Sequence, residues 1–157
     1  MHHKDIILEA KIFSIFPSGE LYWKDKKTLI ISDLHFEKGS SYSNQIKFIP
    51  PFDTIETLRQ LTKFINLHAV ESIIFLGDLI HDKLGFQRMA KKSKELFFEI
   101  LENINCTLTI GNHDNLLFIK DIGLNLSENI VIDGICFSHH PSIDQNSLFW
   151  SLPSKVS

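Results

Sequence analysis

The sequence predicts an α/β fold in which parallel strands alternate with helices. Four apolar runs, at residues 29–31, 73–76, 108–110 and 135–137, have the length and the β-branched content of buried strands. Two amphipathic stretches of helical length separate the first three runs, and such alternation is typical of an α/β sheet. With 43% hydrophobic and 22% charged residues, the 157-residue chain is expected to form one globular domain, residues 1–157.

The N-terminal part is expected to add antiparallel strands to this sheet. Residues 6–16 are apolar and β-branched and predict one strand, which ends at the turn signal Pro-Ser-Gly of residues 17–19. Residues 21–23 resume an extended structure, and a polar turn at 25–27 leads into the first apolar run. Short segments joined by tight turns are typical of antiparallel pairing. The polar stretch 36–51 is expected to be a loop, either functional or a plain connector.

Two longer helices are predicted. The first runs from Asp53 to about residue 67, with Asp53 as its N-cap and Glu56 completing the capping pattern. The second covers residues 86–103, and basic side chains cluster in its first half. A solvated helix face explains this cluster best, and a contact to a phosphate backbone is the alternative. The basic residues are Arg88, Lys91, Lys92 and Lys94.

The elements of the C-terminal third are short. Residues 106–110 predict a strand, and residues 115–122 predict a short helix that ends at Gly123. Residues 129–137 predict a β-hairpin, because two apolar runs flank an Asp-Gly dipeptide there. Neither an internal repeat nor a low-complexity segment is present in the sequence.

The composition and the charge of the chain argue against several classes of protein. A net charge of −3 argues against nucleic-acid binding by bulk charge, although a local basic strip remains compatible with it. No apolar run has the length of a transmembrane helix, and the first residues lack the apolar core of a signal peptide. Cys106 and Cys136 each fall inside a predicted strand and are expected to be buried free thiols. A cytoplasmic protein without membrane contact is therefore expected.

Asp, Asn and His side chains follow the end of every apolar run. In open α/β sheets, ligand and catalytic groups gather beyond the carboxyl ends of parallel strands. Asp33 and His35 are two residues apart, so on an extended backbone both side chains would point the same way. Oxygen and nitrogen donors of this kind suit Mn, Fe or Zn. The predicted metal ligands are Asp33, His35, Asp78, Asn112 and His139.

These donors predict two divalent metal ions, with manganese favoured and iron or zinc as alternatives. Asp78 has two carboxylate oxygens and could bridge the ions, while Asp33 and His35 would serve one ion and Asn112 and His139 the other. Paired ions about 3.5–4 Å apart are the usual arrangement for cleaving phosphoesters, because one ion activates water and both stabilise phosphoryl oxygens.

The two residues after Asn112 are candidates for catalysis. His113 could protonate the leaving-group oxygen or stabilise charge on the phosphate. Asp114 could orient His113 by accepting its ring N–H. His81 either lines the site or lies at the surface, and His140 is expected to have no role.

The order of these motifs resembles that of the calcineurin-like metallophosphoesterases. Within them, the chain is similar to the bacterial branch named for the ligase-associated DNA damage response. The stretches that carry this likeness are residues 17–23, 32–39, 76–81 and 139–141. The resemblance implies a four-layer α/β/β/α sandwich and hydrolysis of a phosphodiester or phosphomonoester by metal-bound hydroxide.

The resemblance also implies a role for each motif residue and a class of partner. It makes His113 the catalytic histidine, and it makes nucleic acid a candidate substrate and DNA-repair proteins candidate partners. The ligands that it implies are Asp33, His35, Asp78, Asn112 and His139.

The sequence departs from this family pattern near its end. Family members continue to a Gly-His-x-His motif and further strands, whereas residues 142–157 contain neither histidine nor glycine. The expectation is therefore a sandwich that lacks its C-terminal strands, with residues 142–157 outside the family pattern. Two functions remain open: a phosphoesterase with an incomplete ligand set, or an inactive remnant that acts at most as an interaction module. The number of protein ligands per ion would distinguish them.

Overall fold

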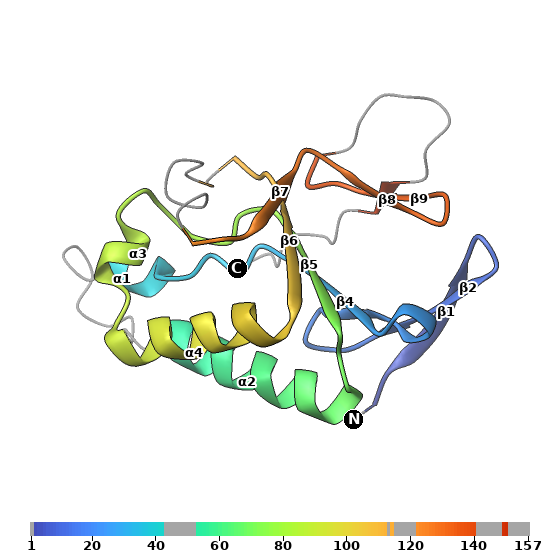
Figure 1. The fold of residues 1–157 in the computed structure, drawn as a ribbon, viewed down its shortest axis with the longest axis horizontal. Coiled ribbons are helices and arrows are strands. Elements are labelled where there is room, and N and C mark those ends of the chain that lie inside the picture. The colour runs from blue at the N-terminus through green and yellow to red at the C-terminus, as the bar shows by residue number, and fades with distance from the viewer. Residues whose placement is uncertain (1, 43–52, 113, 115–121, 141–148, 151–157) are drawn as a thin grey trace.

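Two β-sheets form the centre of the molecule (Figure 1). The computed structural model describes residues 2–42, 53–112, 114, 122–140 and 149–150. The first sheet has seven strands in the order β1-β2-β3-β4-β5-β6-β7, and the second has three in the order β10-β9-β8. The strands of the first sheet are β1 (Lys4–Leu8), β2 (Lys11–Ile15), β3 (Leu21–Trp23), β4 (Thr28–Ser32), β5 (Ser72–Leu76), β6 (Asn105–Thr109) and β7 (Asn125–Ser127).

The seven-stranded sheet is mixed, as predicted. Its strands pair antiparallel from β1 to β4 and parallel from β4 to β7. Ser32 of β4 lies beside Leu76 of β5, which in turn lies beside Thr109 of β6. The carboxyl ends of these three strands therefore meet at one edge. β7 was not predicted, because its three residues, Asn125–Ser127, carry no apolar pattern.

The prediction of one strand over residues 6–16 is wrong. The stretch forms a hairpin in which β1 and β2 pair in the register Leu8 with Lys11. Glu9 and Ala10 make the turn with φ angles of 47° and 60°, the left-handed backbone that a tight type I′ turn requires. Neither residue is Gly, Asn or Asp, so the sequence carries no turn signal at this point.

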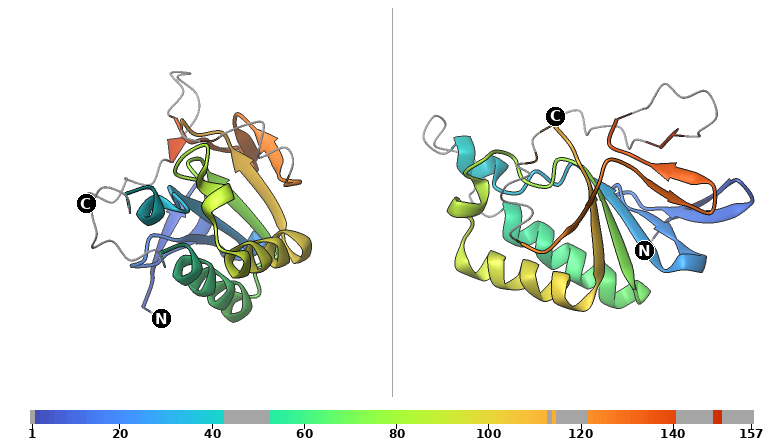
Figure 2. Two further views of the ribbon diagram at one scale, coloured as in Figure 1. Left: turned by 90° about the vertical axis from the view of Figure 1, so that its left-hand side faces the viewer. Right: turned by 45° about the horizontal axis from the view of Figure 1, so that its top comes forward.

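Helices cover one face of the large sheet, and the small sheet covers the other (Figures 1 and 2). Helices α2 (Asp53–His68) and α4 (Lys91–Asn103) pack against each other and against the first face. Strands β8 (Ile130–Ile132), β9 (Ile135–Phe137) and β10 (Phe149–Trp150) form the small sheet. These layers are the α/β/β part of the predicted four-layer sandwich.

Alternate residues of the central strands divide between two apolar cores. Leu29, Ile31 and Phe75 pack with the helices. Ile30 and Ile74 pack instead with residues of the small sheet. A central parallel strand that is buried on both faces reads as a continuous apolar run, which is why the sequence revealed β4 and β5 so clearly.

The first long helix is confirmed, and the second is divided. α2 runs over Asp53–His68. In place of one helix over residues 86–103 there are two, α3 (Gly85–Arg88) and α4 (Lys91–Asn103). Met89 and Ala90 between them have ψ angles of 127° and 146°, which end the helical backbone, and the Met89 side chain enters the core. The helical pattern of the sequence continues across this break and hides it.

The polar stretch after β4 contains a short helix, α1 (Lys38–Tyr42). Asp53, predicted as the N-cap of α2, is the first residue of that helix. Its carboxylate accepts hydrogen bonds from the Thr54 N–H at 2.8 Å and the Gly39 N–H at 2.7 Å. The side chain thus satisfies amides at the starts of two helices.

Other sequence expectations can be placed on the structure. The hairpin of β8 and β9 around Asp133 and Gly134 is confirmed, and Cys106 and Cys136 are buried free thiols. The predicted helix at residues 115–122 lies almost entirely outside the described residues. In the described part of the chain, no helix is long and apolar enough to span a bilayer.

Candidate metal centre

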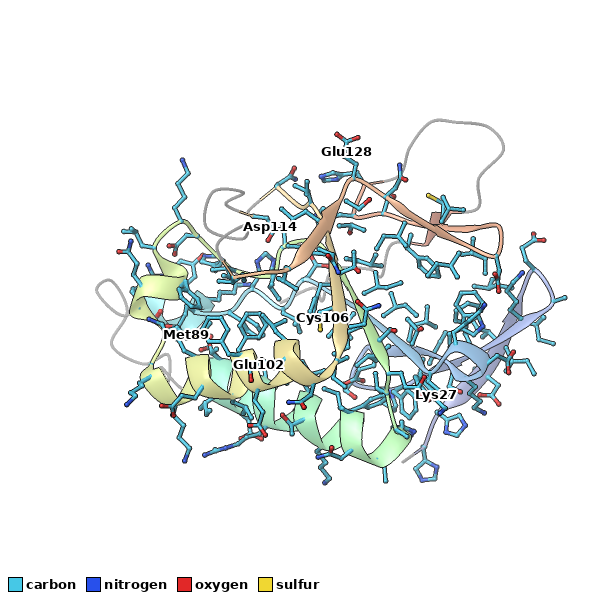
Figure 3. The ribbon with its side chains drawn as sticks, viewed as in Figure 1. Lys27, Met89, Glu102, Cys106, Asp114 and Glu128 are labelled. Atoms are coloured by element: carbon cyan, nitrogen blue, oxygen red, sulfur yellow. The ribbon has the colours of Figure 1, made fainter. Side chains whose placement is uncertain are left out.

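The candidate site lies at the edge of the large sheet where β4, β5 and β6 end. Figure 3 places Asp114 at this edge, just beyond β6. The end of β9 reaches the same place, because the His139 ring contacts the end of β5. The strand ends named by the sequence motifs therefore do meet in space.

The backbone turns sharply at three of the predicted ligands. Asp33, His35 and Asp78 have φ angles of 54°, 43° and 52°, in the left-handed region that side chains other than glycine rarely adopt. The expectation that Asp33 and His35 continue an extended strand is therefore wrong, since β4 ends at Ser32. Such backbone costs about 1–3 kcal/mol per residue and persists only where the surroundings hold it.

Hydrogen bonds between two loops hold this backbone. The loop after β4 pairs with the loop after β5, and the pairing continues as an isolated bridge between Phe36 and Ile80. Three amides of the first loop donate to carbonyls of the second: Asp33 to Gly77 at 3.3 Å, His35 to Asp78 at 2.9 Å and Phe36 to Leu79 at 2.9 Å. The predicted ligands on the two loops are thus held in register with each other.

Carboxylates and imidazoles converge on Asp78, which is only 6% exposed. Ligand atoms of Asp33, Asp78 and His139 all lie within 4.8 Å of one another. The Nε2 atoms of His35 and His139 each lie 3.7 Å from Asp78 Oδ2, and His35 Nε2 lies 3.8 Å from Asp33 Oδ1. The structure therefore brings together four of the five predicted ligands.

The His139 ring is oriented by the main chain. Its Nδ1 lies 2.9 Å from the Leu76 carbonyl oxygen. Because a carbonyl only accepts hydrogen bonds, Nδ1 donates to it, and Nε2 is the ring nitrogen that faces Asp78. A ligating histidine usually donates its other N–H in this way.

Two glycines make room for the predicted ligands Asp78 and His139. A Cβ atom at Gly77 would come within 2.3 Å of His139 Nδ1, and the Gly77 φ angle is 68°. A Cβ atom at Gly111 would come within 2.4 Å of both the amide nitrogen and Oδ1 of Asp78. The sequence motifs contain both glycines, but only the structure shows which side chains need the space.

Asn112 contacts a residue that was expected to have no role. Its Oδ1 lies 3.0 Å from Nε2 of His140, and the His139 and His140 rings lie edge to face with centroids 4.5 Å apart. His140 therefore joins the ends of β6 and β9. Its position directly after His139 was the one signal that the sequence offered.

The two predicted catalytic residues are only partly described. His113 lies outside the described residues, so its role, and its orientation by Asp114, remain predictions. The Asp114 carboxylate accepts hydrogen bonds from three main-chain amides, those of Asp78, Leu79 and Gly111.

His81 and Arg88 border the site on the side of α1. The centroid of the His81 ring lies 5.6 Å from that of His35, edge to face, and 5.7 Å from that of Tyr42.

Arg88 donates two hydrogen bonds to the carboxylate of Asp82, at 3.0 and 2.6 Å, and one to Ser40 Oγ at 3.1 Å. The bond from Arg88 is the main reason that the pKa of Asp82 lies below its usual value. Arg88 therefore joins α3 to α1 while solvent still reaches it, as the prediction of a solvated helix face requires.

The donor set of this cluster suits a divalent metal ion. It consists of carboxylate oxygens and imidazole nitrogens without thiolate, which favours Mn, Fe or Zn. Carboxylates and histidines gathered at the ends of neighbouring parallel strands are typical of metal-dependent hydrolases.

Comparisons with known proteins show the family of the chain and its fold. The sequence model of the calcineurin-like phosphoesterases matches residues 26–154, and the chain belongs to this family. Its fold is similar to that in the crystal structure of the Pseudomonas putida nuclease MPE, with a TM-score of 0.77 and 22% sequence identity. The match covers 94% of this chain and 71% of the nuclease chain. No curated protein matches the chain.

Proposed function

We propose that the chain hydrolyses phosphoester bonds at a site that holds two divalent metal ions. The observation that carries the proposal is the buried Asp78 carboxylate, with the His35 and His139 imidazoles both 3.7 Å from one of its oxygens. Asp78 would bridge the ions, Asp33 and His35 would bind one, and Asn112 and His139 the other. When bound, the ions would activate water and neutralise charge on the phosphoryl oxygens.

The side chains around Asp78 have separate proposed roles in metal binding and in proton transfer. The Leu76 carbonyl holds the His139 ring with Nε2 facing the site, as backbone carbonyls commonly do for histidines that bind metals. His113 is proposed to protonate the leaving-group oxygen. Asp114 is proposed to orient His113 by accepting its ring N–H, or to act through the main-chain amides that donate hydrogen bonds to it.

Manganese is the proposed metal, with iron and zinc as alternatives, because the donors are oxygen and nitrogen atoms only. The proposed substrate is a phosphodiester, and nucleic acid is the first to test, because the similar structure is that of a nuclease. Proteins of DNA repair are the partners that this substrate would suggest.

Turnover tests the proposal directly. The full chain is incubated with Mn²⁺ and bis(p-nitrophenyl) phosphate, beside Asp78→Ala and a control, Asp133→Ala. Asp133 lies in the turn of the β8–β9 hairpin, where its side chain pairs with Lys26. We expect hydrolysis by wild type and by Asp133→Ala, and none by Asp78→Ala. Folded wild-type protein without turnover would contradict the proposal and favour a binding module instead.

A further inference from the structure

One carboxylate connects the loops that follow β5 and β6. Asp114 Oδ2 accepts hydrogen bonds from the amides of Asp78 at 3.0 Å and Gly111 at 2.8 Å. Asp114 Oδ1 accepts from the amide of Leu79 at 2.9 Å. A carboxylate is acceptor-only, so it can satisfy all three donors without conflict. Bonds from amides to a charged acceptor are also stronger than bonds between neutral groups.

We propose that Asp114 is a positioning residue that holds Asp78 in its ligand geometry through these main-chain amides. For the metal, the inference rests on the proposed function. Asp78 has a φ angle of 52°, which its side chain does not favour, so something must hold the backbone there. The Asp114 carboxylate binds the amides of Asp78 and of the next residue, and thereby holds the peptide on each side of the strained residue.

The other ligands depend on the same loop. The carbonyl of Gly77 accepts the Asp33 amide, and the carbonyl of Asp78 accepts the His35 amide. The loop after β4 is therefore positioned by the loop that Asp114 holds. Gly111 brings the β6 end close enough for this contact, since an added Cβ atom there would collide with Asp78.

This role differs from the orientation of His113. If Asp114 acts through His113, its replacement should slow proton transfer and leave metal binding unchanged. If Asp114 acts through the amides, its replacement should weaken metal binding. Asp114→Asn separates the two, because the amide keeps the size but exchanges one acceptor oxygen for a donor, which then faces a backbone N–H.

The first measurement is a Mn²⁺ titration of the full chain, with free Mn²⁺ followed by electron paramagnetic resonance. Loss of a group that orients metal ligands typically weakens metal affinity by about 10–100-fold. We expect a weakening of that size for Asp114→Asn with the number of bound ions unchanged, and wild-type affinity for Asp133→Asn. Wild-type affinity in Asp114→Asn would overturn the inference, and slow turnover in that same case would assign Asp114 to His113.

The second measurement needs no metal. Hydrogen exchange of the metal-free protein should show the amides of Asp78, Leu79 and Gly111 protected in wild type and exchanging faster in Asp114→Asn. Asp78→Asn should bind less Mn²⁺ yet keep this protection. Rapid exchange of the three amides in wild type, or equal exchange in Asp114→Asn, would overturn the inference. If wild type binds no Mn²⁺, the proposed function fails, and exchange alone still decides the role of Asp114.

Discussion

A close approach between Gly77 and the ring of His139 shapes the site. The His139 ring lies against Gly77, where a side chain would meet it at 2.3 Å. Gly77 also has a φ angle of 68°, which glycine adopts without strain. The glycine before Asp78 is therefore a requirement of both the turn and the neighbouring imidazole.

Gly77→Ala should thus weaken metal binding by about tenfold or more, as loss of ligand orientation does, and should destabilise the fold. Mn²⁺ titration and urea unfolding measure the two effects. Gly134→Ala is the matched control, because Gly134 has a φ angle of 83° with nothing within 4 Å of an added Cβ. It should cost about 1 kcal/mol of backbone strain and leave affinity unchanged. Equal affinities in the two variants would contradict this account of Gly77.

The sequence predicted which side chains would lie together at this edge but not their geometry. Asp33, His35, Asp78 and His139 were predicted, because each polar residue follows an apolar strand and strand ends meet in a parallel sheet. The left-handed backbone of Asp33, His35 and Asp78 was not predicted, since aspartate and histidine are only enriched in that region and mostly adopt other conformations. The contact of His140 with Asn112 was missed as well, because it depends on how β9 lies beside β6.

Arg88 connects α1 and α3, the two short helices that border the site. α1 follows the ligand loop of β4, and α3 follows that of β5. The guanidinium group binds Asp82 through two hydrogen bonds and also reaches Ser40 of α1. This pair is partly buried, with side-chain exposures of 30% and 36%.

Arg88→Ala should lower the free energy of unfolding by about 0.5–1 kcal/mol, the upper range for ion pairs that solvent still reaches. Urea denaturation measures the change. Lys91→Ala is the control, because Lys91 pairs with Glu95 along one helix face and its side chain is 91% exposed. That variant should change stability by less than about 0.5 kcal/mol. A larger loss in Lys91→Ala than in Arg88→Ala would count against the connection.

Element prediction succeeded where the apolar pattern ended at a recognisable signal. β4, β5, α2 and the β8–β9 hairpin were found, since each has a clear period or an Asp-Gly turn. The β1–β2 hairpin and the break between α3 and α4 were missed. In both cases ordinary residues adopt the turn or the break, and the packing of neighbouring elements decides the backbone there.

A half-buried histidine, His68, lies where the β2–β3 part of the large sheet meets α2. The His68 ring packs against Phe64 at 4.3 Å, Phe16 at 5.1 Å and Tyr22 at 5.5 Å. Its Nε2 is buried without a hydrogen-bond partner among the described residues. Burial is the main cause that lowers the pKa of His68, because the charged form is poorly solvated there.

This histidine should make the fold less stable in acid. The folded pKa of His68 lies below the unfolded value, so the unfolded chain binds more protons between the two. The stabilisation is therefore complete above the unfolded pKa of about 6.5 and is lost as the pH falls through that value toward the folded pKa. Thermal unfolding of wild type and His68→Phe at pH 7.5 and 5.5 tests this. The variant should lose less stability on acidification, and an equal loss would exclude His68 as a cause.

The number of bound metal ions is the direct test of a dinuclear site at Asp78. The full chain and its Asp78→Ala variant are dialysed against Mn²⁺, and bound metal is measured by elemental analysis. We expect two ions per wild-type chain and the loss of both in Asp78→Ala, because that carboxylate is the proposed bridge. Undiminished metal content in Asp78→Ala would contradict it.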